Sequence, residues 1–292
     1  MSDLVLGGTG RVGRMVVEGL VAQGREVRVL TRSRERARDL PAAVGTIVGD
    51  LLDPRGFPAA FAGAERVFLV NGASQTELFE GLAAVNEARR AGAGHLVYLS
   101  VLGAESAPGV PHFASKMAIE AAIRGSGIPH TILRAGDFYQ NDDAAREAII
   151  GYGVYPHPLG DIGVARVDAR DVADAAVNAM LQGGPRGTCA LVGESLTGAE
   201  TARSYADALG REVRYAGNDL DAWERLMLRM LPAWQVYGLR LMYEVFQQRG
   251  LRAASEHAEQ TRSLLGRAPR TLSEYAGLSA SAWTAEMPLP LP

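Results

Sequence analysis

The sequence lacks the features of secreted, membrane-spanning and nucleic-acid-binding proteins. Its 292 residues include one cysteine, Cys189, which excludes an intramolecular disulfide and suits a reducing compartment. No apolar run approaches the ~20 residues that a membrane-spanning helix needs, and no basic-then-apolar leader marks a signal peptide. The net charge is only −3, which gives no electrostatic reason to expect a nucleic-acid partner. We therefore expect a cytoplasmic protein that binds neither membranes nor nucleic acid.

Several common catalytic and metal-binding motifs are also missing. The histidines show no HExxH or other metal-ligand spacing, and a single cysteine cannot form a zinc site, so we expect no metal. The segment Gly-Glu-Ser-Leu-Thr-Gly at 193–198 is not a GxSxG nucleophile elbow, because its second glycine comes one residue late. Asp168 and Asp171 resemble paired carboxylates, but a strand-end turn followed by a helix N-cap at Asp171 explains both.

The sequence does contain a regular alternation of short β-rich runs and helical patterns. The runs that predict strands are residues 4–6, 27–30, 46–48, 67–70, 96–99 and 130–133. The segments with helical patterns are residues 12–20, 34–40, 78–91 and 113–124. This alternation predicts an α/β protein, a Rossmann-type doubly wound parallel sheet with helices on both faces.

The pattern changes beyond residue 134, which predicts a second domain. Residues 151–163 are rich in Gly, Pro and Tyr and predict a loop, whereas a strand at 164–167 and a helix at 171–181 are expected to return to the main sheet. Further on we expect a strand at 190–192, a capping box of Thr197 and Glu200, a long helical region at 223–246 broken by Pro232, and a frayed proline-rich tail at 287–292. We therefore assign residues 1–150 and 164–182 to the Rossmann domain, and residues 151–163 and 183–292 to a smaller C-terminal α/β substrate domain.

A glycine-rich turn joins the first expected strand to the first expected helix. It reads Gly7-Gly8-Thr9-Gly10-Arg11-Val12-Gly13, a GxxGxxG relative of the dinucleotide-binding fingerprint. Glycine is needed where the backbone turns sharply, where it approaches a pyrophosphate and where the helix packs on the strand, and the helix N-terminus offers free N–H groups to phosphates. An ordinary tight turn is the alternative. The turn residues that we expect to bind the cofactor are Gly7, Thr9, Gly10, Arg11, Val12 and Gly13.

The end of the second strand distinguishes between NAD and NADP. NAD enzymes place an acidic residue there against the ribose 2′-OH, but Thr31-Arg32-Ser33 offers no carboxylate. Arg32 can instead face a 2′-phosphate, or it is a solvated surface arginine. Asp50 follows the third strand, either at the adenine edge or as a turn former. We expect NADP(H) as the cofactor, with further contacts from Asp50, Leu51, Asn71 and Gly72.

Five motifs occur in order along the chain and carry a family resemblance. They are GGTGRVG at 7–13, GDLLD at 49–53, VYLSVLGA at 97–104, PHFASK at 111–116 and TILRAGDFYQN at 131–141. With the later VDARDVADAA and LTGAE segments, they resemble the NmrA-like branch of the atypical short-chain dehydrogenases/reductases over nearly the whole chain. The resemblance implies a Rossmann domain with a smaller substrate domain, and NADP(H) more often than NAD. It matches the glycine motif at Gly7, Gly10 and Gly13, and the 2′-phosphate position at Arg32.

The resemblance also implies candidates for an active site. Lys116 matches the lysine that contacts the nicotinamide ribose, with a surface lysine paired to Glu120 as the alternative. His112 stands where the catalytic tyrosine of Tyr-x-x-x-Lys would be, either as a proton donor or as a histidine packed at a helix start. Ser100 lies near the place of the catalytic serine, although Val101 is the other candidate for that alignment. The proton relay of simple carbonyl reduction is therefore incomplete.

Two groups of residues could contact a substrate. Phe138, Tyr139 and Asn141 follow the strand that ends near residue 133, where ligands bind in such sheets, with core packing as the alternative. The bulky apolar residues between Trp223 and Phe246 form core, a homodimer interface or a pocket for a large flat apolar molecule.

The family includes quinone and dye reductases as well as NADP-responsive regulators, so the activity is open. Reduction of a conjugated acceptor needs less acid catalysis than reduction of a simple ketone, because the product delocalises its charge. We therefore predict an NADPH-dependent reductase that transfers hydride to a flat conjugated acceptor such as a quinone, an enone or a similar aromatic compound. The alternative is an NADP(H)-binding sensor or regulator without turnover.

Overall fold

The computed structural model describes residues 2–181 and 186–286, and in it the chain divides into two compact units. The first unit comprises residues 1–135, 169–191 and 260–267, and the second comprises residues 136–168, 192–259 and 268–292. The expected division placed residues 136–150 and 164–168 with the first unit, and residues 183–191 and 260–267 with the second. The proline-rich tail at 287–292 lies outside the described residues.

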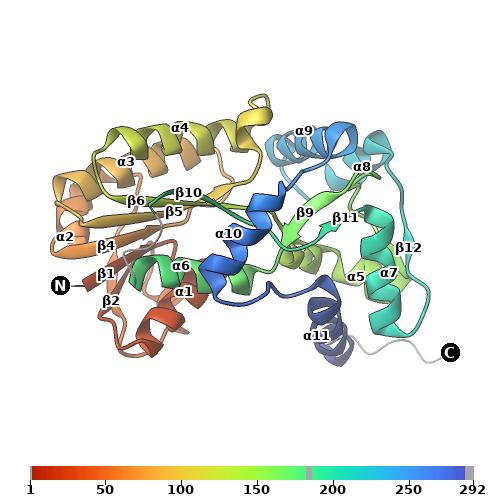
Figure 1. Cartoon of the computed structure of the whole chain (residues 1–292), viewed down its shortest axis with the longest axis horizontal. Helices are drawn as coiled ribbons and strands as arrows, with labels where there is room; N and C mark the ends of the chain where they lie inside the picture. Colours follow the sequence, from red (N-terminus) through yellow and green to blue (C-terminus); the bar gives the residue numbers. More distant parts are fainter. Residues whose placement is uncertain (1, 182–185, 287–292) are drawn as a thin grey trace. The chain divides into compact units, whose positions relative to one another are not determined.

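Seven parallel strands form the sheet of the first unit, in the order β10-β6-β5-β4-β1-β2-β3 (Figure 1). They are β1 (Ser2–Leu6), β2 (Val27–Thr31), β3 (Gly45–Val48), β4 (Ala64–Leu69), β5 (His95–Val101), β6 (His130–Ala135) and β10 (Gly187–Leu191). The strand order reverses beside β1, because β2 follows on one side and β4 pairs on the other. This is the predicted doubly wound sheet, and such sheets bind ligands beyond the carboxyl ends of the strands at the reversal point.

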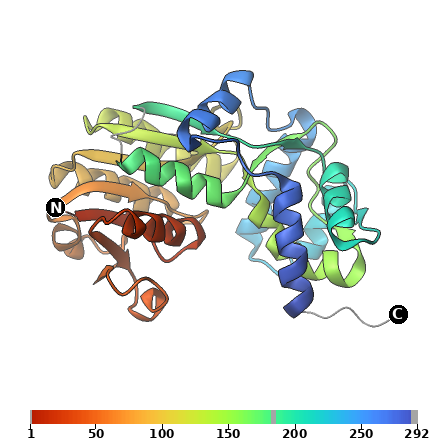
Figure 2. The ribbon, with the colours of Figure 1, turned by 60° about the horizontal axis from the view of Figure 1, so that its bottom comes forward.

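Helices cover both faces of this sheet (Figure 1). One face carries α2 (Phe57–Phe61), α3 (Glu77–Arg90) and α4 (Pro111–Gly125), and the other carries α1 (Arg11–Ala22) and α6 (Ala169–Leu181). Leu4 and Leu6 of β1 belong to the apolar core under α2, α3 and α4, whereas the side chain of Val5 points to the opposite face. On that face α1 and α6 lie side by side (Figure 2), and Gly19 of α1 contacts Val177 of α6 closely.

The second unit contains a three-stranded sheet in the order β11-β9-β7 and a two-stranded sheet of β12 and β8. Its strands are β7 (Asp137–Phe138), β8 (Val154–Tyr155), β9 (Val164–Val167), β11 (Ser195–Leu196) and β12 (Arg214–Tyr215). Its helices are α5 (Arg146–Tyr152), α7 (Gly198–Leu209), α8 (Leu220–Met227), α9 (Ala233–Arg249) and α11 (Leu272–Glu286), while α10 (Ser255–Leu265) is divided between the units. The prediction that β9 returns to the main sheet is wrong, since β9 pairs with β7 and β11.

Local signals in the sequence met mixed outcomes. The capping box is confirmed, because Thr197 Oγ1 accepts from the Glu200 N–H at 3.1 Å and Glu200 Oε2 accepts from the Thr197 N–H at 2.8 Å. The break at Pro232 is also confirmed, since α8 ends before it and α9 begins after it. The helix expected at 34–40 is only a single 3₁₀ turn (Glu35–Ala37), because this charged segment has no apolar stripe to bury.

The N-cap expected at Asp171 is wrong. Helix α6 begins two residues earlier, at Ala169, so Asp171 lies in its first turn. There its carboxylate Oδ1 accepts a hydrogen bond from Arg267 at 2.7 Å.

Among the helices of the described residues, none is both long and apolar enough to cross a membrane.

Candidate functional site

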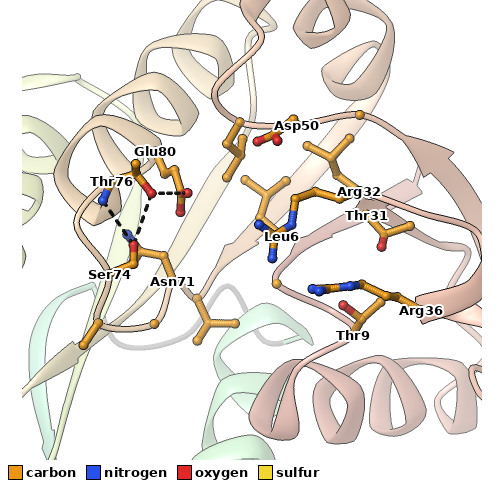
Figure 3. Close-up of a pocket in the computed structure, with 17 residues that line it drawn as sticks. Leu6, Thr9, Thr31, Arg32, Arg36, Asp50, Asn71, Ser74, Thr76 and Glu80 are labelled. Carbon is orange, nitrogen blue, oxygen red and sulfur yellow. Dashed lines mark hydrogen bonds between the residues drawn. The ribbon is translucent and has the colours of Figure 1, made fainter. Parts of the chain in front are cut away.

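A cleft of about 340 Å³ lies at the carboxyl ends of β1, β2, β3 and β4 in the first unit (Figure 3). This volume falls in the range of small-molecule sites, roughly 300–1,000 Å³. The predicted cofactor residues that line the cleft are Gly7, Thr9, Arg32, Asp50, Leu51, Asn71 and Gly72. The other predicted turn residues, Gly10, Arg11, Val12 and Gly13, are the N-cap and first turn of α1. Seven of the residues predicted to bind the cofactor therefore line one cleft.

The three glycines of the GxxGxxG turn are required for different reasons. Gly7 has a φ of +80°, and a Cβ there would lie 2.2 Å from the Val70 carbonyl oxygen. A Cβ on Gly13 would lie 2.2 Å from the Gly7 carbonyl oxygen, so the turn itself needs both glycines. A Cβ on Gly10 would meet only the Gly7 oxygen, at 3.3 Å, and the fold could nearly accommodate it. Glycine at position 10 is thus better explained by close approach of a ligand to the N-terminus of α1, where the first helical N–H groups have no helical acceptor.

Two arginines direct their guanidinium groups toward the cleft (Figure 3). Arg32, at the end of β2, is exposed, and so is Arg36 of the 3₁₀ turn. Within the described part of the chain, neither guanidinium makes a hydrogen bond or ion pair, whereas the nearby Arg38 pairs with Glu35 at 2.6 Å. Sequence reasoning singled out Arg32 and assigned no role to Arg36. The spacing of four residues across the turn was the available signal for Arg36.

Asp50 forms a turn and also lines the cleft. Its Oδ1 accepts a hydrogen bond from the Leu52 N–H at 3.0 Å, which shapes the turn after β3, and the residue also lines the cleft. The opposite wall is a polar chain in which Thr76 Oγ1 lies 3.2 Å from Ser74 Oγ and donates to Glu80 Oε1 at 2.8 Å (Figure 3). Both walls thus offer hydrogen-bonding groups to a ligand.

Lys116 is almost completely buried and holds the segment that follows β4. Its Nζ donates to the Asn71 carbonyl at 2.9 Å, to Asn71 Oδ1 at 3.1 Å and to the Leu99 carbonyl at 3.2 Å, and it lies 3.1 Å from Glu77 Oε1. Burial lowers the pKa of Lys116, although the charge of Glu77 opposes this effect. The alternative of a surface lysine paired with Glu120 is therefore wrong. Because its three N–H groups have acceptors in the protein, Lys116 positions Asn71 in the wall of the cleft.

Glu77, which sequence reasoning missed, joins the two candidates of α4. It is the first residue of α3, is 1% exposed, and its Oε2 lies 2.6 Å from His112 Nδ1. The side chain of His112 is 30% exposed. The only signal for Glu77 was an acidic residue in the first turn of the helix after the fourth strand, where the helix dipole favours a negative charge.

Ser100 belongs to a different buried cluster. Its hydroxyl donates to Glu120 Oε1 at 2.6 Å, and Glu120 also accepts from Arg134 and Arg124. Burial alone would raise the pKa of Glu120, but the hydrogen bonds from Arg134 and Ser100 lower it. The Ser100 proton is thus already engaged in holding this carboxylate.

The predicted substrate residues lie in the second unit. Tyr139 is fully buried, its ring stacks on that of Tyr275 and its hydroxyl donates to Glu194 at 3.1 Å, which supports the packing alternative. Phe138 is partly buried, and Asn141 is exposed. Of the bulky residues at 223–246, those that are buried are Trp223, Val236, Tyr243 and Phe246, and those that are exposed are Leu226, Leu228, Met230, Trp234 and Tyr237.

Comparison with known proteins identifies the family. The sequence model of the NmrA-like family matches residues 4–276. The NAD(P)H azoreductase of Xenophilus azovorans is 32% identical over 288 residues, which cover 97% of this chain and 99% of that protein. A (4-alkanoyl-5-oxo-2,5-dihydrofuran-3-yl)methyl phosphate reductase of Streptomyces griseus is 32% identical over 287 residues, again with 97% and 99% coverage. The NADPH complex of an NADPH-dependent quinone oxidoreductase of Escherichia coli has a TM-score of 0.85 at 24% identity, over 95% of this chain and 99% of that one. This chain therefore belongs to the NmrA-like family, as its motifs predicted.

Proposed function

We propose that this protein is an NADPH-dependent reductase that transfers hydride to a flat conjugated acceptor, such as a quinone, an azo compound or an enone. The observation that carries the proposal is the cleft of the first unit. In it, two arginines whose guanidinium groups have no partner among the described residues stand beside a glycine turn, and no carboxylate ends β2. Bound NADPH supplies the hydride, and the protein supplies its binding and the orientation of the acceptor.

The residues of the cleft fit NADP(H) group by group. The glycine turn and the N-terminus of α1 suit a pyrophosphate, because Gly10 leaves the space that a side chain would fill. Arg32 and Arg36 suit a 2′-phosphate, since charge-assisted bonds from two guanidinium groups favour it over a hydroxyl. Asp50 and Leu51 lie at the adenine edge in this assignment. Lys116 contributes by fixing Asn71, and thereby the wall beyond β4.

Two considerations favour a conjugated acceptor. His112 stands in place of the tyrosine that would protonate a simple ketone, and a delocalised product anion needs less help from an acid. The names of the two relatives at 32% identity describe an azoreductase and a reductase of an unsaturated keto-lactone, and both kinds of substrate are electron-poor conjugated systems.

The experiment that tests the proposal is single-turnover oxidation of NADPH across a panel of quinones, azo dyes and enones, with a saturated ketone as the control. We expect stoichiometric NADPH oxidation with at least one conjugated class and none with the ketone. If NADPH binds and shifts the oligomeric state or partner affinity, but no acceptor oxidises it, the protein is a regulator and the proposal is wrong.

A further inference from the structure

One buried carboxylate serves two basic side chains in the first unit. Glu77 places Oε2 2.6 Å from His112 Nδ1 and Oε1 3.1 Å from Lys116 Nζ. His112 and Lys116 are four residues apart on α4, so both face α3, where Glu77 begins the helix. No other carboxylate of the described residues bonds either side chain.

The bond to Glu77 decides which nitrogen of His112 carries a hydrogen when the ring is neutral. A carboxylate can only accept, so Nδ1 must donate, and Nε2 is left as the second site. Among the described residues Nε2 has no hydrogen-bond partner, and 30% of the His112 side chain is exposed. The ring is thus anchored at one nitrogen by a buried carboxylate and open at the other. This is the arrangement that a proton donor needs.

We propose that His112 donates the proton to the reduced acceptor and that Glu77 is the positioning residue that fixes its tautomer. This inference rests on the proposed function and deepens it. In the reduction of an enone, the β carbon gains a hydride, with two electrons, from NADPH. The remaining proton passes from Nε2 of the His112 imidazolium to the enolate, which leaves a neutral ring with its hydrogen on Nδ1. The exposed edge of the ring then regains a proton from water.

Acceptors should differ in how much their reduction depends on proton donation by His112. An enolate, or the anion left by adding hydride to an azo bond, is a strong base, and its formation benefits from a positioned acid. A hydroquinone anion is a much weaker base and can take its proton from water. We therefore assign enones and azo compounds to the class that depends on His112, and quinones to the class that does not.

The first test does not use activity. Nitrogen NMR of the cofactor-free protein at a pH where the imidazoles are neutral reports which ring nitrogen carries the hydrogen. We expect the Nδ1–H tautomer for His112, assigned by the loss of its signals in His112→Phe. Glu77→Gln should keep this tautomer because its amide oxygen still accepts, whereas Glu77→Met should lose it. His130 is the internal control, since its Nδ1 lies 2.9 Å from the Ile128 carbonyl, which can only accept. An Nε2–H tautomer for His112 in the wild-type protein overturns the proposal, whether or not Glu77→Met folds.

The second test compares two acceptors. His112→Phe should lower kcat on an enone by roughly 10²–10⁴-fold, the usual contribution of a general acid, and lower kcat on a quinone far less. Equal losses on both acceptors, or none, would overturn the assignment of His112.

A double-variant cycle separates the two partners of Glu77. The effect of Glu77→Met on the enone rate should vanish in the His112→Phe background, because Glu77 acts through His112. If the effect persists there, Glu77 acts through Lys116 and the inference is wrong. If none of the acceptors tested causes the wild-type protein to oxidise NADPH, the proposed function fails instead. The NMR result on the tautomer of His112 is independent of that outcome.

Discussion

Arginine is used in opposite ways in the two units. In the second unit, Arg166 is fully buried, and its guanidinium donates to Asp137 at 2.9 Å, to both carboxylate oxygens of Asp142 at 3.0 Å and to the Phe138 carbonyl at 2.9 Å. In the first unit, Arg32 and Arg36 are exposed and line the cleft, and no described side chain bonds their guanidinium groups. A guanidinium saturated by its own protein belongs to the framework, whereas one left open beside a glycine turn is available to a ligand.

Arg166 belongs to a larger network of buried hydrogen-bonded side chains. Asp142 also accepts hydrogen bonds from Tyr155 at 2.9 Å and from Tyr205 at 3.0 Å, and all three groups are buried. Burial raises the pKa of Asp137 and of both tyrosines, and the charge of Arg166 opposes it in each case. Such a network stabilises only when every member is present.

Removal of Arg166 should therefore have the largest effect on stability. Arg166→Met leaves the buried carboxylates of Asp137 and Asp142 without their cation, and we expect unfolding of the second unit to become easier by about 3–5 kcal/mol. All three tryptophans, Trp223, Trp234 and Trp283, lie in the second unit, so denaturation followed by tryptophan fluorescence reports on it. Arg32→Met is the matched control and should stay within roughly 0.5 kcal/mol of the wild type. If Arg166→Met and Arg32→Met changed the free energy of unfolding by similar amounts, the buried arginine would matter no more to the fold than the exposed one.

Two glycines of the turn, Gly10 and Gly13, separate an effect on ligand binding from an effect on folding. Gly10→Val should keep the fold but weaken both NADPH and NADH by more than about a hundredfold, or ~3 kcal/mol, because its side chain occupies the place of the pyrophosphate. Gly13→Val should instead impair folding, since its Cβ would lie 2.2 Å from the Gly7 carbonyl oxygen. Calorimetric titration and thermal melting of the two variants check this. Wild-type affinity in Gly10→Val would make the motif purely structural.

A buried histidine gives the first unit its own pH dependence. His95 is 4% exposed, and burial, together with the charges of Arg186 and Arg66, lowers its pKa to about 4. This pKa lies below the value of about 6.5 in the unfolded chain. The contribution of His95 to the free energy of unfolding is therefore fully present above about pH 6.5 and is lost as the pH falls toward 4, by up to about 3 kcal/mol. His95→Gln should flatten this dependence when the free energy of unfolding is measured between pH 7 and 4 by circular dichroism. An equally steep decline in the variant would assign the acid sensitivity to other groups.

The open arginines should show the smallest but most selective effect. Arg32→Ala removes a charge-assisted bond to the 2′-phosphate, and we expect the affinity for NADPH to fall by roughly ten- to a hundredfold, or ~1.5–3 kcal/mol, with NADH unaffected. Arg36→Ala should act in the same direction. Arg34→Ala is the control, because Arg34 does not line the cleft. Calorimetry that shows equal losses for both cofactors would exclude recognition of the 2′-phosphate by these residues.

The sequence predicted what local rules determine and missed what tertiary packing determines. The glycine turn, the parallel strands of the first unit and the capping box at Thr197 all have signals within a few residues. The sheet in which residues 164–167 pair could not be predicted, because a short apolar run suits either sheet. The bond between Glu77 and His112 joins residues that are 35 positions apart, and no spacing rule connects two helices that only the sheet brings together.

In the proposed reaction, NADPH passes a hydride to a conjugated acceptor. This transfer is tested most directly with NADPH carrying deuterium at the transferable position of the nicotinamide and an enone as the acceptor, because a hydride added to carbon does not exchange with water. We expect one deuterium at the β carbon of each product molecule and one NADPH consumed per product. If the protein binds NADPH tightly but transfers deuterium to none of the enones tested, the protein is not the reductase that we propose.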